Sequence, residues 1–227
     1  MLKFYPTIFW DCDGVILNSN NIKTDAFRSV SLPFGAKASS ELVDFHTKNG
    51  GISRYAKFDY FVEVLIPTYA PEIFVEDKSE FICDLLAAYA SEVKAGLLEC
   101  EIADGLRELR YSTLDTTWFI VSGGDQAELR EVFDSRGISD YFDGGVYGSP
   151  KDKFTIVADL LKADRAQRPC LLVGDSRLDH QVAKAFEIDF IFLHQWTEYS
   201  DWLQYCQSNG IPFASAIRDI FKLDFNL

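Results

Sequence analysis

Short apolar segments rich in β-branched and aromatic residues recur along the chain. Four of them span Thr7–Trp10, Thr116–Val121, Cys170–Val173 and Phe190–Leu193. Each is a continuous apolar run without polar alternation, which is typical of strands that are buried on both faces of a parallel sheet. The pattern therefore predicts four interior strands of one sheet.

Amphipathic segments with helical spacing follow the later strands. Their apolar positions are Leu129, Val132 and Phe133 in the first, Phe154, Val157, Leu160 and Leu161 in the second, and Leu178, Val182 and Phe186 in the third. Strand and helix alternate, so we expect an α/β fold built on a doubly wound, mostly parallel, Rossmann-like sheet.

The stretch from about residue 19 to 98 breaks this alternation. It contains only helical patterns, at Asn20–Val30, Ser39–Lys48, Ile52–Ile66 and Lys78–Lys94. Such a segment is too long for an ordinary loop between two strands. We predict that residues 19–98 form an α-helical cap domain inserted into a core made of residues 1–18 and 99–227. The aromatic-rich tail from Glu198 onward is expected to pack on the core without contributing chemistry.

Composition narrows the class of protein. The chain has 227 residues, 48% of them hydrophobic, and a formal net charge of −13. The acidic balance disfavours binding to nucleic acid or to acidic membranes. Five scattered cysteines without a C-x-x-C pair favour a reducing compartment. With no signal-peptide pattern and no apolar run of membrane-spanning length, we expect a complete cytoplasmic protein. Its oligomeric state cannot be deduced.

Polar residues stand where three of the predicted strands end. Asp11 and Asp13 follow the first strand, Ser122 follows the second, and Asp175 and Asp179 follow the third. In an open parallel sheet the carboxyl ends of the strands meet at one edge, where ligands bind. Carboxylates gathered there would repel each other unless a cation lay among them. Oxygen ligands without His or Cys at ligand spacing favour a hard divalent cation, and Mg²⁺ suits a site shared with a substrate phosphate.

The segment Ser122-Gly123-Gly124 is typical of a phosphate-binding turn. It offers a hydroxyl, unhindered backbone N–H groups and the N-terminus of the following helix. Ser122 and Asp125 would also serve as plain helix caps, so this signal is weak by itself.

A lysine follows in the sequence GSPKDK, at a predicted helix start where Ser149 is the N-cap and Pro150 the first helical residue. Either Lys151 or Lys153 can fill this position. Lys153 fits better, because Ile156, Val157 and Leu160 follow it at helical spacing.

Together these motifs resemble the haloacid dehalogenase-like hydrolase superfamily, and the helical insertion is similar to the cap of its phosphoglycolate phosphatase and β-phosphoglucomutase-like branch. The matching residues, in order, are Asp11-Cys12-Asp13-Gly14-Val15, Ser122-Gly123, the lysine, and Gly174-Asp175-Ser176 with Asp179. The resemblance implies that Asp11 is the nucleophile and that Asp13 is the general acid and base. It further implies that Ser122, Gly123 and the lysine bind the phosphoryl oxygens.

The same resemblance implies that Mg²⁺ is held by Asp11, by the backbone carbonyl of Asp13 and by Asp175. Asp179 stays open, because Ser176 and Asp179 also have the spacing of a helix capping box.

In the cap, the segment from Asn49 to Arg54, followed by Lys57, resembles the family's substrate-specificity loop. Arg54 is a candidate contact to a second anionic or hydroxyl group of the substrate, although an ordinary charged helix start explains the pattern equally well. His46, His180 and His194 are isolated in the sequence and are expected to be surface or packed residues.

Three functions are compatible with these residues. The first is a Mg²⁺-dependent phosphatase that hydrolyses a small phosphorylated metabolite through an aspartyl-phosphate on Asp11. The second is a sugar phosphomutase of the same fold, disfavoured because Lys23 stands where mutases carry a histidine. The third is a non-enzymatic phospho-aspartate signalling module, which the helical insertion and the D-x-D-G-V spacing disfavour.

Overall fold

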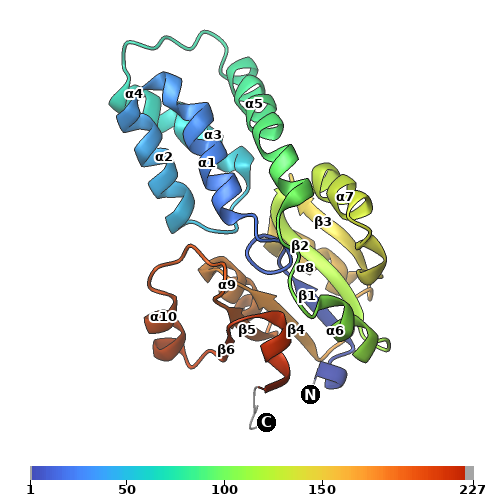
Figure 1. Ribbon diagram of the computed structural model, residues 1–227. Helices are drawn as coiled ribbons and strands as arrows, with labels where there is room; N and C mark the ends of the chain where they lie inside the picture. Colours follow the sequence, from blue (N-terminus) through green and yellow to red (C-terminus); the bar gives the residue numbers. More distant parts are fainter. Residues whose placement is uncertain (1, 223–227) are drawn as a thin grey trace.

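A six-stranded parallel sheet forms the centre of the protein, whose computed structural model describes residues 2–222 (Figure 1). The strand order is β3-β2-β1-β4-β5-β6. The strands are β1 (Thr7–Trp10), β2 (Thr117–Asp125), β3 (Gly145–Ser149), β4 (Cys170–Gly174), β5 (Asp189–Leu193) and β6 (Phe213–Ala214). In the middle of the sheet, Thr7 of β1 pairs with Thr117 on one side and Cys170 on the other. The predicted doubly wound α/β fold is confirmed.

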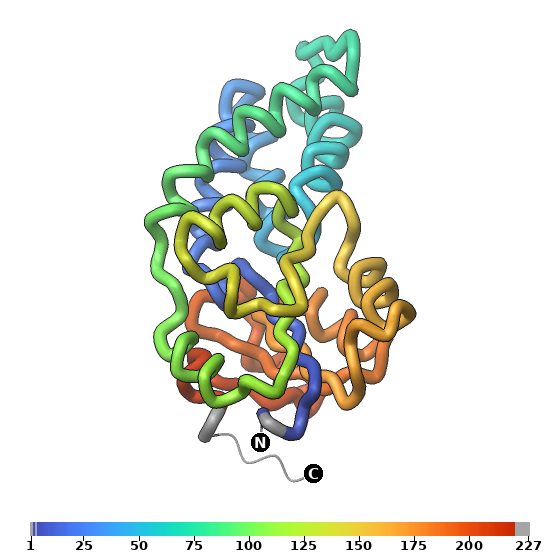
Figure 2. The backbone as a smooth tube through the Cα atoms, turned by 90° about the vertical axis from the view of Figure 1, so that its right-hand side faces the viewer, coloured from blue at the N-terminus to red at the C-terminus, as the bar shows by residue number. Residues whose placement is uncertain are grey.

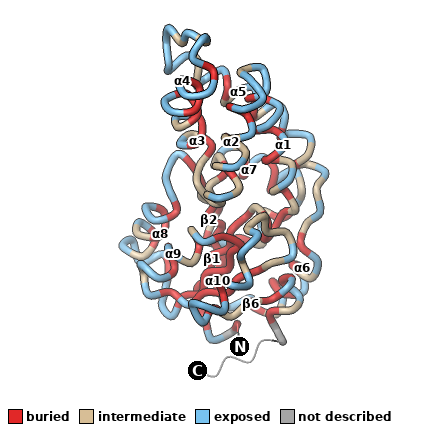
Figure 3. The backbone as a smooth tube through the Cα atoms, turned by 90° about the vertical axis from the view of Figure 1, so that its left-hand side faces the viewer, coloured by how far each residue is buried: buried red, intermediate tan, exposed pale blue. Residues whose placement is uncertain are grey.

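Side chains of β1 alternate between two hydrophobic cores because successive residues of a strand point to opposite faces. Ile8 and Trp10 lie in one core and Phe9 lies in the other. Helices α6 (Leu106–Ser112) and α7 (Gln126–Ser135) cover the first face. Helices α8 (Lys153–Lys162), α9 (Arg177–Ala185) and α10 (Trp202–Asn209) cover the second. The core therefore has three layers, with the sheet buried between helices (Figure 3).

The chain between β1 and α6 is helical and lies beyond the carboxyl ends of the strands (Figure 1). A view from the side shows the same separation of cap above and core below (Figure 2). The cap helices are α1 (Asn20–Ser31), α2 (Ala36–Lys48), α3 (Arg54–Tyr60), α4 (Ile66–Tyr69) and α5 (Lys78–Glu99). Phe27 of α1 contacts both Phe58 of α3 and Tyr89 of α5, so the cap has an aromatic core of its own. The division at residues 19 and 98 stays a prediction.

The apolar pattern of the sequence missed the strands β3 and β6, and it ended β2 too early. β3 has the sequence GVYGS and β6 has two residues, so neither has the apolar run that marked the interior strands. β2 continues past Val121 to Asp125, with a shift of register against β3. The Ser122-Gly123 segment thus belongs to the end of a strand.

The expectation that Ser149 caps a helix beginning at Pro150 is wrong. Ser149 is the last residue of β3, and α8 begins at Lys153 with Asp152 as its N-cap. The Asp152 side chain accepts a hydrogen bond from the backbone N–H of Thr155, as a good N-cap does. Lys153, the lysine favoured by the apolar spacing, is the first residue of the helix.

The cap segment predicted as one helix over Ile52–Ile66 is interrupted. Ser53 caps α3, which begins at Arg54, and a π-helical turn at Phe61–Leu65 separates it from α4. Within residues 2–222, no helix combines the length and the apolar character needed to cross a bilayer.

Candidate active site

Asp11 stands immediately after β1, at the carboxyl edge of the sheet. Its backbone N–H donates to the carbonyl of Val173 at 2.9 Å, which extends the pairing of β1 with β4. The carboxylate accepts a hydrogen bond from the backbone N–H of Cys12 at 2.7 Å. The chain then turns back at once, and Gly14 takes the left-handed φ of 75° that this turn requires.

Lys153, the first residue of α8, joins two carboxylates, one directly after β1 and one in the first turn of α9. Its Nζ lies 2.8 Å from Asp11 Oδ1 and 2.6 Å from Asp179 Oδ1. Burial alone would lower the pKa of this lysine, but Asp11 and Asp179 outweigh burial and raise it. Lys151, by contrast, is exposed and pairs with Asp159. Of the two candidate lysines, the geometry therefore favours Lys153 as the lysine beside Asp11.

Asp11, Asp175 and Asp179 form a buried acidic cluster in which one oxygen from each lies within 4.8 Å of the others. Burial, followed by the charge of Asp179, raises the pKa of Asp11 to about 7. Burial and the charges of Asp11 and Asp179 raise the pKa of Asp175 well above its usual range. One lysine does not balance three carboxylates, so the cluster can accept a further positive charge.

Asp179 has the capping role considered for it and a second partner that the sequence did not indicate. Its side chain and that of Ser176 form the capping box at the start of α9, and it also pairs with Lys153. It belongs to the acidic cluster as well, although it was not among the expected metal ligands.

Asp13 is tied to the cap. Lys23 of α1 lies 2.5 Å from one of its oxygens, and the Ser19 hydroxyl donates to the other at 2.6 Å. Burial opposes ionisation of Asp13, but Lys23 and Ser19 outweigh burial and lower the pKa of Asp13. Asp13 is therefore ionised in this arrangement.

Asn20, the first residue of α1, connects the cap to the core. Its Nδ2 donates to Asp175 Oδ2 at 2.8 Å and to the carbonyl of Trp196 at 2.9 Å. A side chain at Gly14 would lie 2.1 Å from the same Asp175 oxygen. Asp175 is thus enclosed by two segments that follow β1.

The end of β2 lies against a cap loop. Ser122 is buried, and its Oγ accepts a hydrogen bond from the backbone N–H of Gly124 at 3.0 Å. A Cβ placed on Gly123 would lie 2.2 Å from the carbonyl oxygen of Gly51. Glycine at 123 therefore permits the cap to approach the core this closely.

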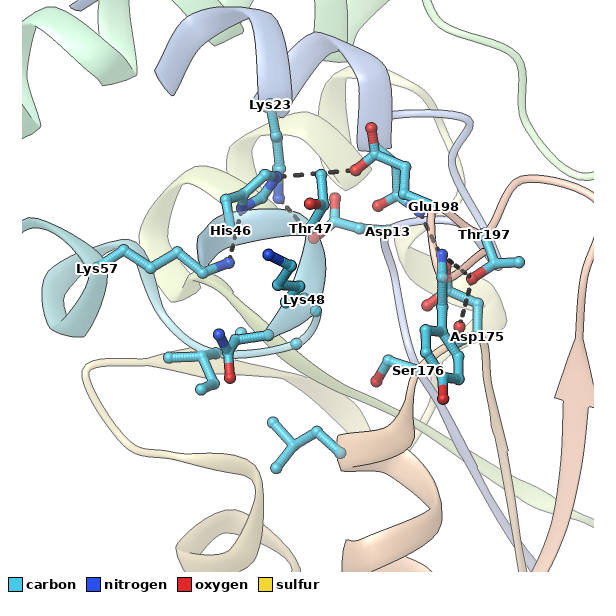
Figure 4. Close-up of a pocket in the computed structure, with 18 of the residues that line it drawn as sticks. Asp13, Lys23, His46, Thr47, Lys48, Lys57, Asp175, Ser176, Thr197 and Glu198 are labelled. Atoms are coloured by element: carbon cyan, nitrogen blue, oxygen red, sulfur yellow. Dashed lines mark hydrogen bonds and ion pairs between the residues drawn. The ribbon is translucent and has the colours of Figure 1, made fainter. Parts of the chain in front are cut away.

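A cavity of about 190 Å³ lies between cap and core (Figure 4). The core contributes the catalytic candidates Asp11 and Asp13, together with Asp175 and the glycines of β2. The cap contributes most of the basic side chains that line the cavity. Residues on its wall include Asp11, Asp13, Lys23, His46, Arg54, Lys57, Gly123, Gly124, Asp175, Thr197, Glu198 and Tyr199. Its volume is below the roughly 300–1,000 Å³ typical of sites for drug-sized ligands, so the cavity suits a small molecule.

The cap residues singled out by sequence differ in their surroundings. Both terminal nitrogens of Arg54 face the carboxylate of Glu128, and its guanidinium lies over the Tyr89 ring at 4.7 Å. Lys57 is buried and lies 2.8 Å from His46 Nδ1. The role of Arg54 as a substrate contact stays a prediction.

Residues of the C-terminal tail were missed as part of the site. Thr197, Glu198 and Tyr199 line the cavity, and the Thr24 hydroxyl of α1 bonds to both oxygens of Glu198 at 2.8 Å. These partners lie 174 positions apart, and no local pattern in the sequence marks them.

Residues 5–187 match a family model described as haloacid dehalogenase-like hydrolase. This match covers most of the chain, so the protein belongs to the haloacid dehalogenase-like hydrolases, and the resemblance inferred from its motifs is confirmed. A search of curated proteins finds no match to the chain.

Solved structures with the same fold span nearly the whole chain. A predicted phosphoglycolate phosphatase from Haemophilus somnus is 17% identical, covers 96% of this chain and 97% of its own, and has a TM-score of 0.73. A predicted phosphatase from Clostridium acetobutylicum is 15% identical, with coverages of 96% and 97% and a TM-score of 0.69. A haloacid dehalogenase-like family protein from Streptococcus pneumoniae is 20% identical, with coverages of 98% and 99% and a TM-score of 0.60. At these identities the likeness concerns the fold.

Proposed function

We propose that this hydrolase is a Mg²⁺-dependent phosphatase that acts on a small phosphorylated metabolite. The observation that carries the proposal is the arrangement around Asp11. Its carboxylate lies 2.8 Å from Lys153 Nζ and lines the cavity together with Asp13, Gly123 and Asp175. A nucleophile, a proton carrier and donors for phosphoryl oxygens thus face one small space.

The donor set fits a hard divalent cation. The acidic cluster consists of oxygen ligands, is buried, and carries more negative charge than Lys153 balances. Asp11, Asp175 and the backbone carbonyl of Asp13 would hold Mg²⁺, with Asp179 beside them. When bound, the ion would supply positive charge against the phosphoryl oxygens and restore the ionised form of the carboxylates.

The protein's side chains and backbone would carry out nucleophilic attack, proton transfer and stabilisation of the phosphoryl oxygens. Asp11 attacks the phosphorus atom, and the alkoxide of the leaving group departs, which leaves an aspartyl-phosphate on Asp11. Asp13 provides the proton for that alkoxide and later takes one from the water that cleaves the acyl-phosphate. Lys153, the Ser122 hydroxyl and the N–H groups of the Gly123 segment stabilise the negative oxygens.

In the present arrangement Asp13 is held ionised by Lys23 and Ser19, which is the form that accepts a proton from water. To protonate a leaving group, Asp13 must first take up a proton and loosen its ion pair with Lys23. The first half of the reaction therefore requires a change at this pair.

The test is release of inorganic phosphate from a panel of small phosphomonoesters, with Mg²⁺ and with EDTA. We expect activity with Mg²⁺, loss of it in EDTA, and a fall of at least about 10³-fold in Asp11→Asn, because that change removes the nucleophile. Asp159→Asn, at an exposed aspartate, is the matched control and should retain activity.

Two results would contradict this proposal. A bisphosphate-activated isomerisation without free phosphate would indicate the mutase instead. A stable phospho-aspartate without turnover would indicate a signalling module. The cytoplasmic location and the absence of nucleic-acid and membrane partners stay predictions.

A further inference from the structure

Lys57 is a buried amine on the cap wall of the cavity. It belongs to α3, its residue is 3% exposed, and its side chain points from the cap toward the cavity (Figure 4). It lies in the cap, whereas the groups proposed to hold the phosphoryl group belong to the core. A role in the chemistry of Asp11 therefore does not account for it.

The partner of this amine is an imidazole. Lys57 Nζ lies 2.8 Å from His46 Nδ1, and within residues 2–222 it forms no ion pair with a carboxylate. A protonated amine has only donors, so His46 Nδ1 accepts and the ring carries its proton on Nε2. Burial and the charges of Lys57 and Lys23 lower the pKa of His46 well below its usual range, so the ring is neutral.

Glu198, an acidic group from the core, does not balance Lys57 directly. Its oxygens accept from the Thr24 hydroxyl, and its Oε2 lies 3.8 Å from His46 Nε2. The other amine of the cluster, Lys23, is paired with Asp13. Lys57 is therefore left with a neutral hydrogen-bond partner.

Such an amine is poorly stabilised in its charged form. Burial, followed by the charge of Lys23, lowers the pKa of Lys57 to about 7. An anion that entered the cavity would supply the missing counter-charge and a second acceptor for the amine.

We propose that Lys57, oriented by His46, recognises a second anionic group carried by the leaving-group part of the substrate. The inference rests on the proposed phosphatase function, in which the core holds the phosphoryl end. The rest of the substrate then faces the cap, where Lys57 is, among the residues that the structure describes, the buried cation without a carboxylate partner.

Two other basic residues on the cavity wall fit this role less well. Arg54 already directs both terminal nitrogens to Glu128. Lys48 has a side chain that is 75% exposed, where water screens an ion pair. A single amine near Glu198 matches a singly charged carboxylate better than a doubly charged phosphate, so we expect the carboxylate to give the larger effect.

The experiment compares three phosphate esters of similar size that differ in the second group. Ethyl phosphate has no second charge, 2-phosphoglycolate has a carboxylate, and ethylene glycol bisphosphate has a second phosphate. We expect Lys57→Met to lower kcat/KM at least tenfold for 2-phosphoglycolate, mainly through KM, and less than twofold for ethyl phosphate. Lys57→Gln should behave in the same way, which guards against a folding defect peculiar to one variant.

The matched control is Lys37→Met, which removes an exposed lysine of α2 that pairs with Glu41. This substitution should change kcat/KM by less than twofold for each of the three substrates. Equal losses for ethyl phosphate and 2-phosphoglycolate in the Lys57 variants, or no loss for either, would overturn the proposal. A loss confined to the bisphosphate would keep the anion site and overturn the preference for carboxylate.

A binding measurement separates this inference from the proposed function. Calorimetry with phosphonoacetate and with ethylphosphonate needs no turnover. Lys57→Met should weaken the binding of phosphonoacetate at least tenfold and leave the binding of ethylphosphonate unchanged. If the wild-type protein binds phosphonoacetate in this way but hydrolyses none of the three esters, the phosphatase proposal fails and the anion site stands. If it hydrolyses them while Lys57→Met leaves phosphonoacetate binding unchanged, the anion site fails alone.

Discussion

Lys153 of the core and Lys57 of the cap are both buried at the site, and the two lysines differ in what they contact. Lys153 lies between Asp11 and Asp179, and these carboxylates raise its pKa. Lys57 contacts the His46 ring, and burial lowers its pKa. Burial is nearly equal, at 1% and 3% exposed, so the partners decide the charge. Lys153 therefore has its counter-charges within the core, whereas in the proposal above Lys57 would receive its counter-charge from the substrate.

The largest effect on stability is expected in the core. Lys153→Met leaves Asp11 and Asp179 buried without their cation, and breaking such a pair costs about 3–5 kcal/mol of unfolding free energy. Urea unfolding in EDTA would measure it. The control Lys151→Met removes an exposed ion pair with Asp159 and should cost under about 1 kcal/mol.

Mg²⁺ sharpens this comparison. Because the ion would supply positive charge in place of the one that Lys153→Met removes, the loss of unfolding free energy in this variant should be smaller in Mg²⁺ than in EDTA. Equal costs for the two lysine variants would show that Lys153 does not stabilise the acidic cluster.

A smaller, pH-dependent effect is expected in the cap. Below pH 7 Lys57 is protonated in both the folded and the unfolded chain, and the penalty of burying its charge is fully present. Between about 7 and 10.5 the unfolded chain keeps the proton and the folded chain releases it, so stability rises with pH. Between pH 7 and 9 the unfolding free energy of wild type relative to Lys57→Met should rise by about 2 kcal/mol.

Chemical denaturation of both proteins at several pH values would check this prediction. The charged or titratable groups around Lys57 are Lys23, His46, Asp13, Glu198 and Lys153. All are present in both proteins, so their contributions largely cancel. A difference that stays constant from pH 7 to 9 would mean that Lys57 keeps its proton when folded.

The smallest effect is expected where the two regions touch. In Gly123→Ala the new methyl group would collide with the Gly51 carbonyl at 2.2 Å, so the cap loop must withdraw from the core. We expect kcat/KM to fall about tenfold, equivalent to ~1.4 kcal/mol, with little change in stability. Gly50→Ala, whose added methyl would lie 3.4 Å from Ser176 Cβ, is the control and should be nearly neutral.

The core of the site was predictable because parallel strands bring their carboxyl ends to one edge. Asp11 and Asp175 follow neighbouring strands β1 and β4, so their proximity follows from sheet topology. The start of α8 at Lys153 was predictable for a different reason, since the apolar spacing after it is that of a helix. Ser149 was assigned the wrong role because Asp152 is the better placed cap.

The cap side of the cavity was not predictable in this way. Lys57 and His46 meet through the packing of α3 on α2, and Glu198 reaches the cap from a loop beyond β5. No periodicity of the sequence encodes how two helices and a distant loop pack together. The pairing of Arg54 with Glu128 of α7 escaped for the same reason.

The two hydrogen bonds of the Asn20 side chain connect the position of the cap to the proposed metal site. The Asn20 amide group joins the start of α1 to the Trp196 carbonyl and also donates to Asp175, one of the carboxylates proposed to hold Mg²⁺. A movement of α1 that displaces Asn20 would therefore break its hydrogen bonds to Trp196 and to Asp175 together.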